Sequence, residues 1–226
     1  KMVIKIRNGG LFLEFQKIKL HRSEKRGSAV TQITLDDDYN VPDYRQDIVK
    51  VIKEHGELRF DEVKAMEGAA WIKGSLIFKV LYRSDKQEGK ISCLRGEIPF
   101  QERLNMDGLS EYDAVHAVGD IEDLTVGVIN SRKLNIRAVI VLTASADTEV
   151  DEELTCELSD GSDYEQNIVE KEALKLLVVR RDICRQKSEA VLPSSKPNIR
   201  EILWQSMQLR NVESRLTEGN IRLSGE

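Results

Sequence analysis

The sequence has 226 residues, of which 40% are apolar, so it is long enough for one large domain or two ordinary ones with a hydrophobic core. Its formal net charge is −5 and its pI is about 5.5, so the overall field does not attract nucleic acid, which we do not expect as a partner. The longest apolar runs, such as 138–144, are far shorter than the roughly 20 residues of a membrane helix, and we expect no membrane span.

The cysteines point to a reducing compartment. Cys93, Cys156 and Cys184 are odd in number, widely spaced and outside any C-x-x-C pair. This spacing argues against a disulfide framework and against a zinc site. The N-terminus also lacks the apolar core of a signal peptide, so we expect a soluble cytoplasmic protein.

The first third of the chain mixes strand patterns with one helix pattern. Residues 11–20 and 28–35 are rich in branched and aromatic residues, which predicts two strands. Residues 41–52 differ, because Ile48, Val51 and Ile52 recur at i, i+3 and i+4, while Asp43 and Gln46 have the spacing of a capping box. This pattern predicts a short helix of two turns.

From residue 69 to residue 148 the apolar pattern has a period of two. The segment 69–83 places one set of apolar residues on a single face: Ile72, Leu76, Phe78, Val80 and Tyr82. The segment 132–144 does the same with Leu134, Ile136, Ala138, Ile140 and Leu142. Gly74 interrupts the first pattern and predicts a bulge. With 90–104 and 114–129 as further strands, the sequence predicts an antiparallel β-sandwich or barrel-like domain.

An acidic run follows these strands. Residues 147–165 carry nine acidic residues and no basic one. Such a run repels itself, which predicts a solvated linker over 149–165. It lacks the alternating ligand register and the central glycine of a calcium loop, so we expect no metal there. Downstream, residues 173–183 predict another strand.

The chain near its end repeats an earlier part of itself. Written under 41–75 at a constant offset of 151, residues 192–226 match without a gap. The defining residues of the first copy are Pro42, Ile48, Arg59, Gly68 and Gly74, and those of the second are Pro193, Ile199, Arg210, Gly219 and Gly225. The paired Pro, Arg and Gly lie outside a helical pattern, which favours duplication over chance. The sequence therefore predicts a complete unit over 1–148 and the beginning of a second over 166–226, with a helix at 192–203.

No catalytic constellation is visible. His21, His55 and His116 are isolated from one another, which is typical of structural or surface histidines. The acidic run 36–38 is typical of a solvated loop, because sequence neighbours point apart. Arg59 and Arg210 recur beside leucine, which indicates an inter-strand ion pair. For the two tryptophans, Trp71 and Trp204, burial in the core is favoured over a role as exposed anchors for a partner.

Four blocks of sequence carry a resemblance to a known family. They are "AVTQITLDDDYNVPD", "GEIPFQERLNMDGL", "DIEDLTVGVINSRKLNIRAVIVLT" and "LPSSKPNIREILWQSMQLRNVESRL". Together they resemble the SPOCS-domain family of spore-coat morphogenetic proteins in spore-forming Firmicutes, over most of residues 11–226. The resemblance implies a non-enzymatic scaffold at the forespore surface, in the mother-cell cytoplasm.

The resemblance also implies partners. Family members bind spore coat morphogenetic proteins, among them the coat-basement ATPase, and commonly end in a peptidoglycan-binding LysM module. This chain shows no such module and is expected to be an N-terminal portion. The resemblance carries over no catalytic residue and no cofactor.

Two functions thus remain in view. The first is a protein-interaction scaffold in spore coat assembly, in which repeated units raise avidity. The alternative is a carbohydrate- or peptidoglycan-binding cell-wall protein, which the 5% aromatic content disfavours because stacking platforms are scarce. The incomplete second unit is expected either to pack on the first or to self-associate with another chain, and Trp204, Ile221 and Leu223 are its candidate protein-binding residues.

Overall fold

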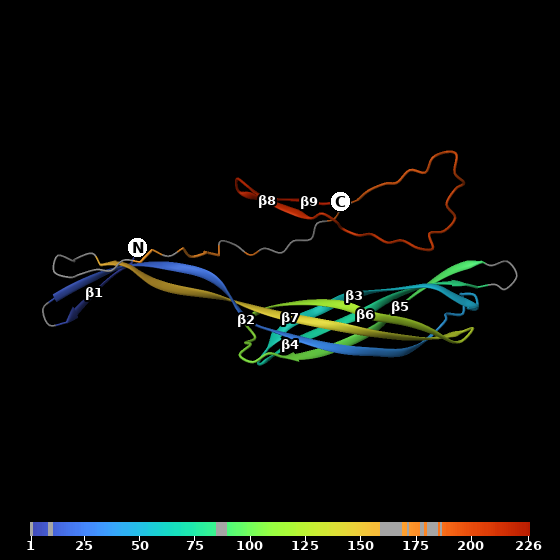
Figure 1. Cartoon of the computed structure of the whole chain (residues 1–226), viewed down its shortest axis with the longest axis horizontal. Helices are drawn as coiled ribbons and strands as arrows, with labels where there is room; N and C mark the ends of the chain where they lie inside the picture. Colours follow the sequence, from blue (N-terminus) through green and yellow to red (C-terminus); the bar gives the residue numbers. More distant parts are fainter. Residues whose placement is uncertain are drawn as a thin grey trace.

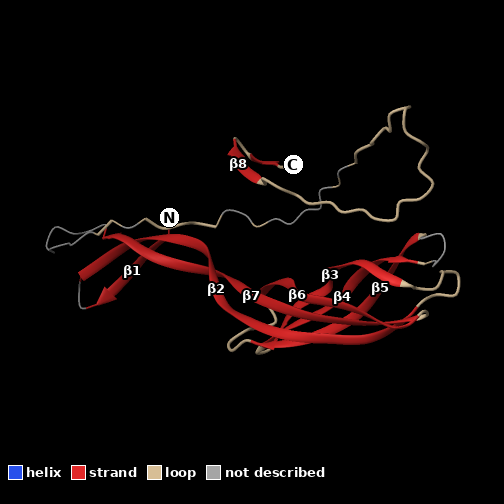
Figure 2. Ribbon diagram, turned by 45° about the vertical axis from the view of Figure 1, so that its right-hand side comes forward, coloured by secondary structure: helices blue, strands red, loops and turns tan. Residues whose placement is uncertain are grey.

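The computed structural model of the chain describes residues 2–8, 11–84, 90–158, 169–170, 172–176, 179, 185 and 187–226; the side chains of residues up to 15, and of 157 and 158, are not described. The described residues form strands and loops without a helix (Figure 2). The strands are β1 (Met2–Asn8), β2 (Leu11–Asn40), β3 (Lys50–Met66), β4 (Ala69–Arg83), β5 (Ile91–Asn105), β6 (Ala114–Asn130), β7 (Lys133–Leu158), β8 (Glu213–Thr217) and β9 (Asn220–Ser224).

Two antiparallel sheets face each other as a sandwich. One has the order β1-β2-β7-β6 and the other has the order β3-β4-β5 (Figure 1). Strand β3 lies beside β6, and β5 approaches β2, so the two open sides are partly closed. The predicted antiparallel β-sandwich or barrel-like fold is confirmed.

The period-two patterns form the core as predicted. The inward residues of β4 and β7 are fully buried: Ile72, Leu76, Phe78, Val80 and Tyr82 from β4, and Leu134, Ile136, Ala138, Ile140, Leu142, Ala144 and Ala146 from β7. Burial of side chains of this size contributes about 1.5–3 kcal/mol each for the large residues, so these two strands supply much of the stability of the sandwich.

The predicted acidic linker is wrong for residues 149–158, which continue β7. Beyond the sandwich, this part of β7 pairs with the first half of β2 as a long two-stranded ribbon (Figure 1). The β2 side of the ribbon is basic, with Lys17, Lys19 and Arg22, whereas the β7 side is acidic. Lys17 Nζ lies 3.3 Å from Glu153, and Arg22 Nε lies 3.3 Å from Glu152. The acidic run therefore meets a basic run instead of repelling itself. Residues 159–165 of the predicted linker lie outside the described residues.

The ribbon also corrects the prediction at the N-terminal side. Residues 11–20 and 28–35 are one strand, β2, which continues through the charged stretch between them. A register shift between Lys25 and Gly27 marks where the ribbon meets the sandwich. Of the strand predicted at 173–183, residues 173–176 are described and are not in a strand, although Leu176 N donates to His21 O at 2.8 Å. The rest is described only at Val179.

The predicted helices at 41–52 and 192–203 are wrong. Residues 41–49 form a loop with a turn at 43–45, and β3 begins at Lys50. The loop amides find partners on the β6–β7 turn and on β4: Val41 N donates to Arg132 O, Ile48 N to Ser131 O and Val49 N to Arg83 O. These tertiary hydrogen bonds replace the helical ones. Residues 192–203 are also a loop, with a turn at 194–195.

Candidate interaction site

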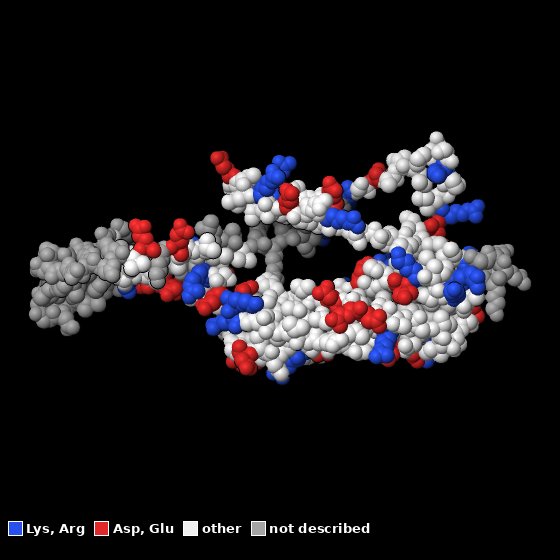
Figure 3. Space-filling view, viewed as in Figure 1, with Lys and Arg blue, Asp and Glu red and all other residues white. Residues whose placement is uncertain are grey.

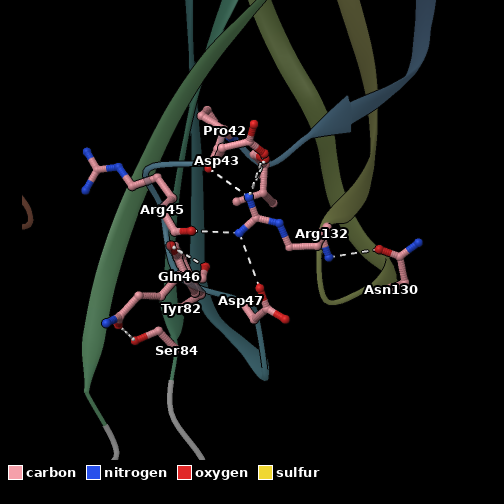
Figure 4. Close-up of polar contacts among 10 residues, drawn as sticks. Pro42, Asp43, Arg45, Gln46, Asp47, Tyr82, Ser84, Asn130 and Arg132 are labelled. Carbon is pink, nitrogen blue, oxygen red and sulfur yellow. Dashed lines mark hydrogen bonds and ion pairs between the residues drawn. The ribbon is translucent and has the colours of Figure 1, made fainter.

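One arginine organises the loop between β2 and β3. Arg132 lies in the tight turn between β6 and β7, where the Asn130 side chain accepts a hydrogen bond from its amide at 2.8 Å. Its guanidinium donates to the carbonyl oxygens of Arg45 at 2.6 Å, Pro42 at 3.0 Å and Val41 at 3.1 Å (Figure 4). It also reaches the carboxylates of Asp47 at 3.3 Å and Asp43 at 3.5 Å. A planar guanidinium with several donors suits this many acceptors.

The other side of this loop is held by Gln46. Its carbonyl oxygen accepts from the Tyr82 hydroxyl at 3.2 Å, and its side-chain oxygen accepts from Ser84 Oγ at 2.8 Å (Figure 4). Burial raises the pKa of Tyr82, so the phenol stays protonated and donates. Asp43 and Gln46, predicted as a helix cap, instead bind Arg132 and Ser84. With Tyr44 82% exposed beside them, the loop presents a fixed polar surface at one end of the sandwich.

Sequence reasoning missed Arg132. The only local signal was its place after Asn130 and Ser131 in a turn between two apolar strands. Nothing in that spacing shows that the turn faces residues some 90 positions earlier in the chain.

The acidic run at 36–38 is also part of this end. It lies in β2, not in a loop, and Asp36 and Asp38 share one face, where both accept from the Asn135 amide at 2.8 and 3.2 Å. A hydrogen bond from Lys133 to Asp38 holds the pKa of that carboxyl below its usual range. Asp36 and Asp38 are thus paired with side chains of the neighbouring strand β7, which is a structural role.

The two segments related by the offset of 151 share their backbone features. The turn at 43–45 has a counterpart at 194–196, and Arg45 N donates to Pro42 O as Lys196 N donates to Pro193 O, both at 2.9 Å. The β3–β4 hairpin turns at Gly68 and the β8–β9 hairpin turns at Gly219, with φ of 69° and 75°. Only glycine adopts this conformation freely.

The strand register is shared as well. Met66 pairs with Ala69 as Thr217 pairs with Asn220, and the pairs further along the two hairpins keep the same offset. In β3 a bulge between Phe60 and Glu62 separates the Phe60–Gly74 pair from the Glu62–Lys73 pair, and Arg59 pairs with Ser75 just before it. Arg210 and Glu226, at the equivalent positions, exchange two backbone hydrogen bonds of 2.7 and 2.9 Å, with Gly225 next in line.

The arginines of the two hairpins differ in their side-chain partners. Arg59 forms ion pairs with Asp61 at 2.9 Å and with Glu97 on β5 at 3.3 Å, so the predicted inter-strand ion pair is confirmed for this residue. Arg210 instead donates to the Gln208 side chain at 2.6 Å.

The candidate protein-binding residues lie apart from Arg132. Ile221 and Leu223 on β9 are 65% and 68% exposed. Trp204 is partly buried, and its ring lies against Lys53 and His55 of β3. Trp71 is also partly buried, on the outer side of the β3-β4-β5 sheet. Burial of both tryptophans in the core, the favoured reading, is therefore wrong.

The remaining chemistry-bearing residues are structurally partnered. His21 lies 2.7 Å from Asp151, His55 3.2 Å from Glu57 and His116 3.7 Å from Asp147. Among the residues that the structure describes, no group of three or more His, Cys, Asp or Glu is placed to hold a metal ion, and no helix could cross a bilayer. Cys93 and Cys156 are free thiols, and Cys184 lies outside the described residues. A hollow of 280 Å³ on the β8–β9 hairpin is lined by Arg215, Arg222 and Ser224.

Comparison with known proteins finds one family model, and the residues that it matches lie in the sandwich. The family model of the SipL SPOCS domain matches residues 47–129. This range runs from the end of the loop that Arg132 binds through β3, β4, β5 and most of β6. This part of the chain is therefore similar to the SPOCS domain. No curated protein and no solved structure matches the chain. The SPOCS match favours a sporulation-related role in protein interaction over catalysis.

The SPOCS match does not include all of the structural unit. Strand β7 and the sandwich part of β2, which supply one wall of the core, lie outside the matched residues. Arg132 lies outside them too, just past the C-terminal end of the match. The folded unit is therefore larger than the part that the family model recognises.

Proposed function

We propose that this protein is a non-enzymatic protein-interaction scaffold in the assembly of the spore coat or envelope. The observation that carries the proposal is the SPOCS-domain match over residues 47–129. The mother-cell cytoplasm at the forespore surface is its proposed location, and spore coat morphogenetic proteins, including the coat-basement ATPase, are its proposed partners.

The surface of the sandwich supports a binding role. Acidic and basic side chains are interspersed over the face seen in Figure 3, so no single-sign field marks it for nucleic acid. Several titratable groups form ion pairs within the fold, as at Glu57, where the Lys79 hydrogen bond lowers the carboxyl pKa. A surface of this kind recognises partners by shape and by many small contacts.

We also propose that residues 193–226 open a second SPOCS-like unit. The shared turn, hairpin, register and glycine positions support this proposal. Two units of one kind on a chain make the second contact with a repetitive partner intramolecular, which raises avidity without new contacts. Such a partner is what a coat lattice provides.

The test is a comparative binding assay with the full chain. The immobilised protein is exposed to extract from sporulating mother cells and, separately, to purified peptidoglycan. Retention of coat morphogenetic proteins, identified by mass spectrometry and absent from extract of vegetative cells, is the expected result. Sedimentation with peptidoglycan and no retention of coat proteins would instead establish the cell-wall alternative.

A further inference from the structure

The C-terminal segment contacts the sandwich at one place. Of residues 187–226, all of which are described, only Leu203 and Trp204 are partly buried, whereas the others are exposed. In Figure 1 the segment forms a wide loop beside the end of the sandwich at which β3 starts and β4 stops. The burial of two neighbouring apolar residues in an otherwise exposed segment marks this place as a contact.

The contact is made by the indole of Trp204. Lys53 Nζ lies 5.0 Å from the ring centroid, a cation–π distance. The His55 ring lies 6.1 Å from it, edge to face at 61°. Lys53 and His55 are alternate residues of β3 and therefore share one side of the sheet, and the indole lies over both.

The surface below the contact extends across the sheet. Lys53 pairs with Leu81 of β4, and Leu81 pairs with Cys93 of β5, so the three form one row on the outer side. Burial raises the pKa of the Cys93 thiol, and the Glu201 carboxylate contributes to the same direction. Glu201 lies three residues before Trp204, on the segment that contacts Lys53 and His55.

The contact joins equivalent positions of the repeated segments. The offset of 151 places Trp204 on Lys53 and Leu203 on Ile52. The start of β3 therefore contacts the equivalent position of the second segment. Contacts between equivalent positions are also what a two-fold interface has. The residue type differs, because one side supplies a cation and the other the ring that receives it.

We propose that the outer side of the β3-β4-β5 sheet around Lys53, Leu81 and Cys93 is the docking surface for the second repeated unit, with Trp204 as its anchor. The inference rests on the proposed second unit and not on the role in sporulation. Docking fixes how the two units are oriented relative to each other. A tryptophan suits this position because its ring buries area while its edges contact polar groups.

The test uses Trp204 as its own probe. In the full chain with Trp71→Phe, Trp204 is the remaining one of two tryptophans. Replacing Lys53 and His55 by alanine is expected to shift its emission to the red and to raise its acrylamide quenching constant about twofold. The matched control replaces Lys64, also on β3, and His116, whose side chain is 41% exposed against 43% for His55, and is expected to change neither.

A second readout follows the thiol below the segment. In the full chain with Cys156→Ser and Cys184→Ser, Trp204→Ala is expected to speed alkylation of Cys93 about fivefold, with Trp204→Phe between the two. Unchanged quenching in the Lys53/His55 variant, an equal change in the control, or an unchanged alkylation rate would overturn the docking proposal. So would a quenching constant that depends on protein concentration, since the contact would then lie between chains. None of these outcomes bears on the coat-protein binding assay.

Discussion

Gly74 of β4 lies directly opposite the bulge of β3 and against the carbonyl oxygen of Arg59, so that a Cβ at Gly74 would clash with that oxygen. It would also lie 2.8 Å from the Phe100 ring. We expect Gly74→Ala to lower the free energy of unfolding by about 1–3 kcal/mol, because neither the backbone nor the ring can withdraw without disturbing the core. Urea unfolding of the full chain measures this.

Gly127 provides the control for that substitution. It lies in β6, where the nearest heavy atom to an added Cβ is 3.8 Å away. Gly127→Ala is expected to change stability by less than about 0.5 kcal/mol. Equal effects of the two substitutions would show that the bulge is not tightly packed.

Arg132 is expected to stabilise the loop before β3. Arg132→Ala leaves the carbonyl oxygens of Val41, Pro42 and Arg45 without their donor, and we expect a loss of about 1–2 kcal/mol, since the site is partly solvated. Arg132→Lys retains the charge but not the several donors, so its loss is intermediate. Hydrogen exchange of residues 41–49 should accelerate in both. Arg137→Ala, at an exposed position of β7, is the control and should leave that exchange unchanged.

The ribbon is expected to depend on its charge pairing. Lys17→Glu places like charges across the ribbon and should speed amide exchange in the ribbon, whereas adding Glu153→Lys should restore much of the protection. The coupling energy expected for a pair of this exposure is about 0.2–1 kcal/mol. It should shrink in 1 M salt, because screening acts strongly on exposed charges. A coupling that salt does not alter would contradict an electrostatic origin.

Asp113 is expected to make stability depend on pH at the acid side. Its Oδ2 accepts from the Ser110 amide at 2.8 Å, and this hydrogen bond holds its pKa below the ordinary 3.8. A pKa depressed by folding contributes stability that is present above 3.8 and is lost as the pH falls through the folded-state pKa.

The variant Asp113→Asn should therefore be less stable than the parent at pH 7, and the difference should narrow below pH 3.8. Urea unfolding at a series of pH values measures this, with Asp107→Asn in the same loop as the exposed control. A difference that stays constant over the whole series would assign the effect of Asp113 to something other than its charge.

The strands of the sandwich were predictable where a local alternation of apolar residues marks them. They were not predictable where a segment becomes a strand by pairing with residues far along the chain. The alternation around Ile72 and Leu134 predicts strands that are buried on one side, because a strand turns successive side chains to opposite faces. The charged stretch between Leu20 and Ser28 reads as a loop on its own. It becomes a strand because the complementary run about 125 residues later pairs with it.

The same limit applies to the loop and to the candidate site. Ile48 and Val51 have helical spacing, but a two-turn helix is marginal by itself. Hydrogen bonds from the loop amides to the carbonyl oxygens of Ser131 and Arg83, and from the Arg132 guanidinium to the loop, outweigh it. The repeat offset predicted that Gly68 and Gly219 are equivalent, and the structure places both in hairpin turns, which require particular residues. The hairpins themselves were not predicted. The offset did not predict the Trp204 contact, since the equivalent residue is Lys53 and a repeat in the sequence does not show which parts of the two segments meet in space.

The two-stranded ribbon formed by β2 and β7 sets the distance between its far end and the sandwich. Each residue along it advances about 3.3 Å, and side chains return to the same side after two residues. Removing two facing residues from each strand would bring its far end about 7 Å closer to the sandwich while every remaining side chain kept its side, whereas removing one would turn them all over. The length of this ribbon can therefore change without inverting its faces only in steps of about 7 Å.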